Sequence, residues 1–184
     1  MASSTQSVSS DERVAALRAR IDEALPAVVD GRSPASLYDA VEHVLRAGGK
    51  RVRPVLLLLV AQSYGTSVDR ALPAALAVEV FHNFTLVHDD LMDEDDERRG
   101  GATVHAKWNP GTAILAGDLM MGLSYDLLGQ VEGTDAEALY AVYHPMVERL
   151  RAGQAPHASF DTDHAVAREA SLAMIAPHTR ALLP

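Results

Sequence analysis

The chain has 184 residues, of which 48% are hydrophobic and only 5% aromatic, and this length is enough for one domain with a sizeable core. The net charge of −9 argues against a nucleic acid partner recognised through a broad basic surface. The absence of cysteine excludes disulfides and thiolate metal sites, and no apolar run is long enough for a membrane span. We therefore expect a cytoplasmic protein, with no membrane span, built from helices packed on helices.

The chain is predicted to begin with a disordered serine-rich tail over residues 1–10. One all-α domain is predicted over residues 11–184. Apolar residues at helical spacing predict a helix over 12–29 and a second one ending at Arg46. The residues expected to cap these two helices are Asp11 and Ser33.

A cluster of basic residues follows in the segment GGKRVRP. Pro54 suits the first turn of a helix that runs to Tyr64, and this helix is apolar on nearly every side, which predicts a central place in a bundle. Lys50, Arg51 and Arg53 would then lie at the N-terminus of a buried helix. Free backbone N–H groups, the helix dipole and three cations together predict an anion site. Three solvated charges at a helix start are the alternative.

A second central helix is predicted over residues 70–92, and it leads into the acidic stretch HDDLMDEDDERRGG. At about 3.6 residues per turn, His82, Asp89 and Asp93 lie on one stripe of this helix, with Asp90 beside it. Stacked carboxylates repel each other, but a divalent cation between them removes the repulsion, and hard oxygen ligands suit Mg²⁺, which also accepts phosphate oxygens. The end of this helix is therefore predicted to hold Mg²⁺ for a phosphorylated ligand. A solvated acidic loop is the alternative.

The remainder of the chain also reads as helical. Pro110 begins a predicted helix over 110–128, and Thr134 is expected to cap a helix that ends near Arg151. The segment 153–163 is predicted to be irregular, and a last helix is expected over 164–183. No strand-like alternation of any length is found.

Three segments in this order, GGKRVRP, HNFTLVHDDLMDEDDERRGGATVH and AILAGDLMM, resemble the N-terminal half of the trans-polyprenyl diphosphate synthases. DDLMD matches the first aspartate-rich motif of that family, and the resemblance covers roughly residues 40–130. It implies an all-α helical bundle of the isoprenoid synthase type, a homodimer, and a short-chain enzyme of the farnesyl or geranylgeranyl class. The implied reaction is the Mg²⁺-dependent condensation of isopentenyl diphosphate with an allylic diphosphate.

The resemblance also implies roles for single residues. Asp89 and Asp93 would hold Mg²⁺ ions that bridge the diphosphate of the allylic substrate, and Asp90 would support them. Arg98 would contact the same diphosphate. The residues implied for the diphosphate of isopentenyl diphosphate are Lys50, Arg53, His82 and Arg99.

Two residues on the central helix are candidates for control of product length. One helical turn spans about 5.4 Å, so Thr85 and Phe84, four and five positions before Asp89, lie just over a turn from the metal. A prenyl tail that grows along this helix must pass them, and the rigid ring of Phe84 could form a floor. In similar enzymes an aromatic residue near this place restricts products to short chains. Ordinary core packing of Phe84 is the alternative.

The sequence also departs from the family. Family members are considerably longer and carry a second aspartate-rich motif, before which this sequence ends, so the chain is expected to be C-terminally incomplete and inactive alone. Gln154 matches the family's Gly-Gln segment, whereas His157 and the pair His178–Thr179 depart from it.

Two other hypotheses remain open from the sequence. One is a non-catalytic or half-site subunit that needs a partner chain. The other is a metal-dependent phosphohydrolase that uses His88 and Asp89 as ligands. That second hypothesis needs further ligands, for which His43 and Asp118 are the only candidates.

Overall fold

The computed structural model describes residues 9–160, and their side chains except those of 151 and 153–160. Contacts divide the chain into two units, residues 1–132 and 133–184. The predicted helix over 164–183, with His178 and Thr179, lies outside the described residues. Among the described residues, no helix is long and apolar enough to cross a membrane.

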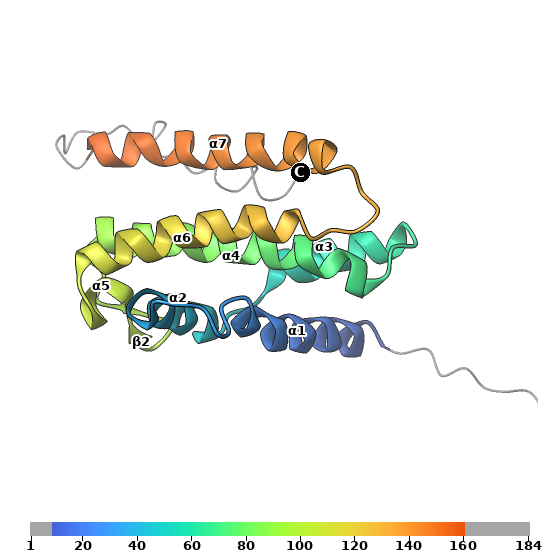
Figure 1. Ribbon diagram of the computed structural model, residues 1–184, viewed down its shortest axis with the longest axis horizontal. Coiled ribbons are helices and arrows are strands. Elements are labelled where there is room, and N and C mark those ends of the chain that lie inside the picture. Colours follow the sequence, from blue (N-terminus) through green and yellow to red (C-terminus); the bar gives the residue numbers. More distant parts are fainter. Residues whose placement is uncertain (1–8, 161–184) are drawn as a thin grey trace, which may run out of the picture. The chain divides into compact units, whose positions relative to one another are not determined.

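The first unit, as far as it is described, contains six helices and one hairpin (Figure 1). The elements are α1 (Ser10–Ala27), α2 (Ala35–Arg46), α3 (Val52–Ser63), α4 (Val68–Met92), β1 (Glu97–Arg98), β2 (Gly101–Ala102), α5 (Val104–Lys107) and α6 (Pro110–Leu128). The all-α prediction is confirmed apart from the hairpin, whose two-residue strands are too short to show alternation in a sequence.

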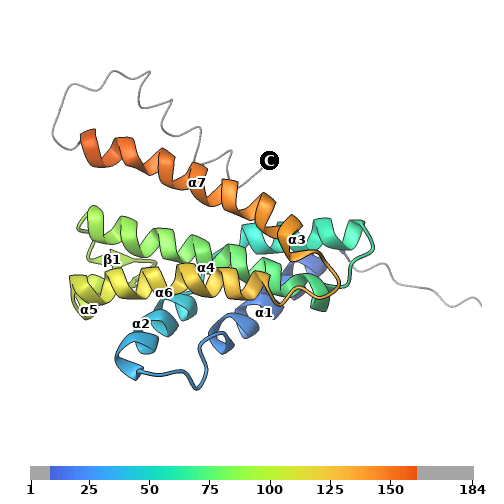
Figure 2. The ribbon, with the colours of Figure 1, turned by 45° about the horizontal axis from the view of Figure 1, so that its top comes forward.

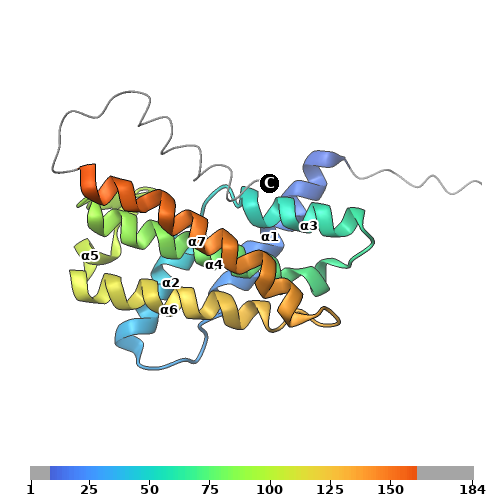
Figure 3. The same cartoon turned by 90° about the horizontal axis from the view of Figure 1, so that it is seen from above.

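The core of this unit is the pair α4 and α6, which lie side by side in Figures 2 and 3 and share the most extensive contact in the chain. α1 and α2 form a second layer against this pair (Figure 1). α4 is buried on several sides, because small and apolar residues surround its axis rather than forming one stripe. Its one buried amide, Asn83, donates through Nδ2 to the carbonyl of Glu79 at 2.8 Å.

The close approach of α4 and α6 depends on Gly117. A Cβ atom at this position would lie 2.2 Å from His88 Nε2 on α4. The imidazole instead packs edge-on against Phe84, with ring centroids 4.9 Å apart, and its Nε2 lies 3.3 Å from the carbonyl oxygen of Ile114. Glycine therefore leaves the space that this histidine occupies.

α3 buries one face only, which corrects the prediction that it is central. Pro54, Val55 and Leu58 are buried against the first unit. The residues of the opposite face, spaced by four positions, are exposed: Val52, Leu56, Val60 and Tyr64. The second central helix is therefore α6.

Two of the predicted caps are displaced and a third is absent. Ser9 rather than Asp11 caps α1, because the Ser9 hydroxyl accepts from the amide of Glu12 at 3.2 Å while the Glu12 carboxylate accepts from the amide of Ser9 at 2.8 Å. Of the predicted disordered tail, Ser9 and Ser10 thus belong to this helix start, and residues 1–8 lie outside the described part. No side chain caps α2, where Ser33 was expected.

The second unit is described through α7 (Ala136–Phe160). Asp135 rather than Thr134 caps this helix, since its Oδ1 accepts from the amide of Glu137 at 3.0 Å. α7 runs on through 153–160, a segment predicted to be irregular. Gly153 and Pro156 both disfavour helix, so intrinsic propensity does not account for this extension. Gln154 and His157 lie on this part of α7.

Candidate active site

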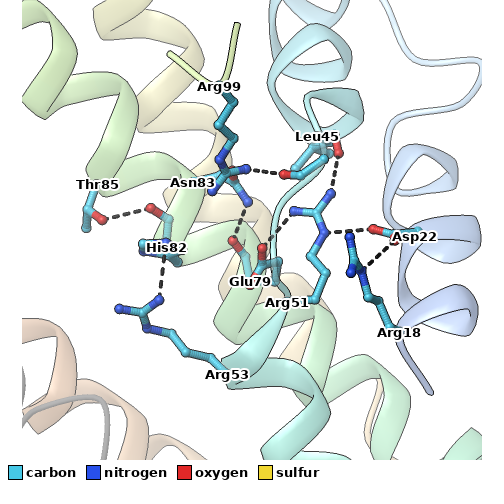
Figure 4. A network of polar contacts seen from close by, with 11 residues as sticks. Arg18, Asp22, Leu45, Arg51, Arg53, Glu79, His82, Asn83, Thr85 and Arg99 are labelled. Carbon is cyan, nitrogen blue, oxygen red and sulfur yellow. Dashed lines mark hydrogen bonds and ion pairs between the residues drawn. The ribbon is translucent and has the colours of Figure 1, made fainter. Parts of the chain in front are cut away.

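A pocket of about 580 Å³ opens where the start of α3, the middle of α4 and the β1–β2 turn meet. Its lining includes four residues that the sequence predicted for one diphosphate: Lys50, Arg53, His82 and Arg99. Figure 4 shows Arg53, His82 and Arg99 close together, on three different elements. The structure thus brings together residues that are up to 49 positions apart in the sequence.

The loop before α3 owes its shape to left-handed backbone conformations. Gly48 and Gly49 have φ of 73° and 147°, values that glycine adopts without strain. A Cβ at Gly49 would lie 3.0 Å from Arg99 Nη1, so glycine lets the Arg99 guanidinium lie over the loop. That guanidinium donates to the carbonyl of Gly48 and ties the hairpin turn to the loop.

Arg51, predicted to join the anion site, is instead bonded within the protein. It is 3% exposed. Its Nε donates to Asp22 at 2.8 Å, its Nη1 to Glu79 at 2.7 Å and its Nη2 to the carbonyl of Leu45 at 3.0 Å (Figure 4). A buried charge needs such partners. This guanidinium is paired with carboxylates of the protein itself and is not available to an anion, so the prediction for Arg51 is wrong.

His82 contributes no charge to the pocket. Arg53 Nη1 lies 3.3 Å from His82 Nε2, and because a guanidinium can only donate, Nε2 accepts and the ring proton is on Nδ1. Burial, followed by the charges of Arg53 and Arg99, lowers the pKa of His82 from 6.5 to about 3. The imidazole is therefore neutral at physiological pH.

The cations of the pocket are crowded and partly removed from water. Burial lowers the pKa of Arg53, with the charge of Glu79 opposing, and burial followed by the charge of Arg51 lowers the pKa of Arg99. Arg53 Nε is buried and has no hydrogen-bond partner among the described residues. An anion in the pocket could reduce this repulsion and offer acceptors to the guanidinium donors.

The acidic end of α4 lies two helical turns further along the same helix. Asp93 is the C-cap residue, and its amide donates to the carbonyl of Asp89 at 2.8 Å. Asp89 is half-buried, whereas Asp93 and the rest of the stretch to Glu97 are exposed. In the described part of the chain, no group of three histidine or acidic residues could hold a metal by itself. Two carboxylates can supply only part of a coordination shell, which suits Mg²⁺ because this ion keeps several waters and takes phosphate oxygens.

Asp90 pairs with Arg98 on β1. The Asp90 side chain is buried, and one of its oxygens accepts from Arg98 Nε. Burial raises the pKa of Asp90, and the hydrogen bond and charge of Arg98 oppose that rise. The same guanidinium reaches Asp95 at 4.0 Å. Asp90 therefore fixes the position of Arg98 at the acidic end of α4.

Comparison with known proteins assigns the chain to a family. Residues 34–183 match the polyprenyl synthetase family. This chain belongs to the polyprenyl synthetase family.

Relatives within the polyprenyl synthetases support the assignment in sequence and in structure. The geranylgeranyl diphosphate synthase of Methanosarcina mazei is 40% identical over 166 residues, which are 89% of this chain and 50% of the relative. A short chain isoprenyl diphosphate synthase of Methanocaldococcus jannaschii is 39% identical over 165 residues, again 89% of this chain and 50% of the relative. The crystal structure of the geranylgeranyl pyrophosphate synthetase from Pyrococcus horikoshii matches with a TM-score of 0.85 and 36% identity, over 94% of this chain and 54% of that one. The chain thus spans about half the length of these polyprenyl synthetases.

Neither the comparisons nor the geometry favours the phosphohydrolase hypothesis. His43 Nε2 lies 2.9 Å from the carbonyl oxygen of Ala102, and its Nδ1 lies 3.2 Å from Lys107 Nζ, so both ring nitrogens face protein partners. Asp118 is exposed on α6. The same contact of His43 holds β2 against α2, a tether that sequence reasoning missed because the two residues are 59 positions apart.

The two residues proposed to control product length are both buried on α4. The ring centroid of Phe84 lies 5.3 Å from that of Phe81, and Phe84 is only 4% exposed. The Thr85 hydroxyl donates to the carbonyl of His82 at 2.7 Å. The role of Phe84 as a floor for the product remains a prediction.

Proposed function

We propose that this polyprenyl synthetase chain carries the two diphosphate-binding regions of a short-chain trans-prenyl diphosphate synthase of the geranylgeranyl or farnesyl type. The substrates would be isopentenyl diphosphate and an allylic diphosphate. The observation that carries the proposal is the convergence of Lys50, Arg53, His82 and Arg99 on one pocket, two helical turns from the carboxylates of Asp89 and Asp93.

The cationic pocket would hold isopentenyl diphosphate without metal. Arg53 and Arg99 present planar donors that match phosphate oxygens, and Lys50 adds a point charge. His82, neutral and accepting from Arg53, would orient that guanidinium without adding to the repulsion among the cations.

The acidic end of α4 would hold the allylic diphosphate. Asp89 and Asp93, on one stripe of the helix, would be the protein ligands of Mg²⁺, since the C-terminal end of a helix carries a partial negative charge that favours cations. Mg²⁺, when bound, would neutralise the diphosphate and stabilise it as a leaving group. Arg98, held by Asp90, would add a positive charge to the same leaving group.

The reaction would begin with ionisation of the allylic diphosphate and end with loss of a proton. The allylic C–O bond breaks and releases diphosphate, and the allylic carbon bonds to the terminal alkene carbon of isopentenyl diphosphate. The positive charge then lies on the internal alkene carbon, and a proton leaves the CH2 group between this carbon and the carbon that bears the diphosphate. The released diphosphate takes that proton as the new double bond forms, so we assign no side-chain base. Following the resemblance, we also propose that the protein is a cytoplasmic homodimer. Analytical ultracentrifugation tests the oligomeric state.

The test is product analysis. Labelled isopentenyl diphosphate is incubated with a catalytically active form of the enzyme that contains this chain, together with an allylic diphosphate and Mg²⁺, and the dephosphorylated products are separated by chromatography. The proposal predicts label in a prenyl chain longer than the allylic substrate. Label incorporated only after a second chain is added would indicate a half-site subunit, and inorganic phosphate released from a simple ester without elongation would indicate a phosphohydrolase.

A further inference from the structure

One buried ion pair joins four helices in the wall of the cationic pocket. Arg51 and Glu79 have side chains that are 1% and 3% exposed, and their charged atoms lie 2.7 Å apart. Arg51 also bonds Asp22 on α1 and the last turn of α2 through the Leu45 carbonyl (Figure 4). Glu79 lies on α4, three positions before His82.

The backbone of Arg51 connects this pair to the pocket. Arg51 is the N-cap residue of α3 and has φ of 50°, a left-handed conformation that is uncommon for a residue with a side chain. Lys50 precedes it and Arg53 follows two positions later, so the direction of both side chains depends on how Arg51 is held. The three hydrogen bonds of its guanidinium hold its side chain, and the amide of Val55 bonds its carbonyl.

Glu79 is also a counter-charge to the pocket as a whole. Besides its contact with Arg51, its negative charge opposes the lowering of the pKa values of Arg53 and Arg99 by burial. Without that carboxylate, three guanidinium groups would face each other with less compensation.

We propose that Glu79, acting through Arg51, is a positioning residue for the diphosphate pocket: it fixes the left-handed start of α3 so that Lys50 and Arg53 face the ligand before the ligand arrives. This inference rests on the proposed function for the identity of the ligand. It separates Arg51 and Glu79, which line the pocket but bond each other, from the residues that would contact diphosphate.

The variant Glu79→Gln distinguishes positioning from simple electrostatics. Removal of a negative charge from a cationic pocket would by itself strengthen the binding of an anion. A positioning role predicts the opposite, namely a dissociation constant for isopentenyl diphosphate that rises by about tenfold. The measurement is titration calorimetry of the 184-residue chain in metal-free buffer, and unchanged or tighter binding by Glu79→Gln overturns the inference.

Two further variants provide a second test and a control. Asp22→Asn removes the less buried carboxylate from Arg51 and keeps the experiment decisive if Glu79→Gln does not fold; we expect a smaller loss of affinity, and unchanged or tighter binding again overturns the inference. Asp69→Asn removes an exposed carboxylate at the start of α4 and serves as the control for net charge, with wild-type affinity expected.

Amide hydrogen exchange tests the same inference without ligand. The reporter is the amide of Val55, which donates to the Arg51 carbonyl at 3.1 Å. In Glu79→Gln, or in Asp22→Asn should the former not fold, we expect this amide to exchange about tenfold faster while the amides of α6 keep their wild-type rates. Equal acceleration of both sets would mean a general loss of stability and overturn the inference. If the wild-type chain binds no isopentenyl diphosphate, the proposed function fails, and the Val55 rate alone decides whether Glu79 fixes the loop.

Discussion

The two charged regions of α4 are built in opposite ways. Around His82, each guanidinium has a partner: Arg51 bonds Glu79, Arg53 bonds His82, and Arg99 bonds the carbonyl of Gly48. Eleven positions further on, the carboxylates from Asp93 to Glu97 are exposed to solvent. The first region is arranged by hydrogen bonds within the protein, and the second by its place at a helix end.

This difference indicates what each region requires from its ligand. The cationic pocket has its geometry fixed in advance, so little ordering remains for a diphosphate to induce. The acidic end has unfavourable electrostatics until a cation binds, because negative charges gather at the negative end of a helix dipole. We therefore expect variants in the first region to affect affinity without metal, and variants in the second to act only when Mg²⁺ is present.

The largest expected effect is at the acidic end. Asp89→Ala should weaken the Mg²⁺-dependent binding of a non-hydrolysable allylic analogue by about 100-fold or more, because loss of a direct ligand exceeds the usual effect of losing an outer-shell partner. Titration calorimetry with and without Mg²⁺ measures this, and circular dichroism confirms that the helix is retained. Unchanged affinity in both Asp89→Ala and Asp93→Ala would refute the metal assignment.

The next effect concerns Phe84, which lies between the two regions. Phe84→Ala should lower the free energy of unfolding by about 3–5 kcal/mol, because the ring is buried. In a catalytically active form of the enzyme it should also lengthen the products. Phe81→Ala is the matched control, since it deletes a fully buried ring one turn away and should destabilise without changing product length. The same product distribution in active Phe84→Ala and wild type would place the floor on another helix.

The free energy of unfolding should depend on pH through His82, the neutral imidazole of the cationic pocket. The folded-state pKa of His82, about 3, lies below its ordinary value of 6.5, so below pH 6.5 the unfolded chain binds a proton that the folded chain does not. The stabilising contribution of neutral His82 is complete above pH 6.5 and is lost as the pH falls towards 3, by up to about 1.4 kcal/mol per pH unit. Urea unfolding of His82→Gln should show a shallower decline than wild type across this window. Parallel pH profiles would mean that His82 is protonated in the folded protein over the same pH range as in the unfolded chain, and would contradict the lowered pKa.

The smallest effect should have the opposite sign from the other substitutions. Asp93→Asn removes a negative charge from the C-terminal end of α4 and should raise the free energy of unfolding by about 0.3–1 kcal/mol in metal-free buffer. Urea unfolding in the presence of a chelator measures it. A loss of stability would mean that Asp93 is already compensated without a cation.

The sequence could predict the relative placement of functional residues that lie on one helix or one loop. The stripe of His82, Asp89 and Asp93 follows from helical periodicity alone, and the structure places the first two on α4 and Asp93 at its C-cap. The basic cluster before α3 was visible for the same reason, because its members are neighbours in the chain.

What the sequence could not show are pairings between distant positions. Arg51 and Glu79 are 28 residues apart. No local pattern separates Arg51, bonded to protein, from Arg53, whose Nε has no hydrogen-bond partner in the described part of the chain. A signal was present in hindsight, since Glu79 is a lone carboxylate in an apolar part of a helix and a buried charge needs a partner. The caps of α1 and α7 were misplaced by two residues and one residue, because Ser9 stands close to Asp11 and Thr134 stands next to Asp135.

The measurement that tests the account most directly is the titration of one variant, Arg53→Ala, with both ligands. Two separate sites predict that isopentenyl diphosphate binds about 10- to 100-fold more weakly, as expected for lost charge-assisted hydrogen bonds, while the Mg²⁺-dependent affinity for the allylic analogue stays within about twofold of wild type. Equal losses for both ligands would contradict the account, because they would mean that the cationic pocket and the acidic end of α4 form a single site.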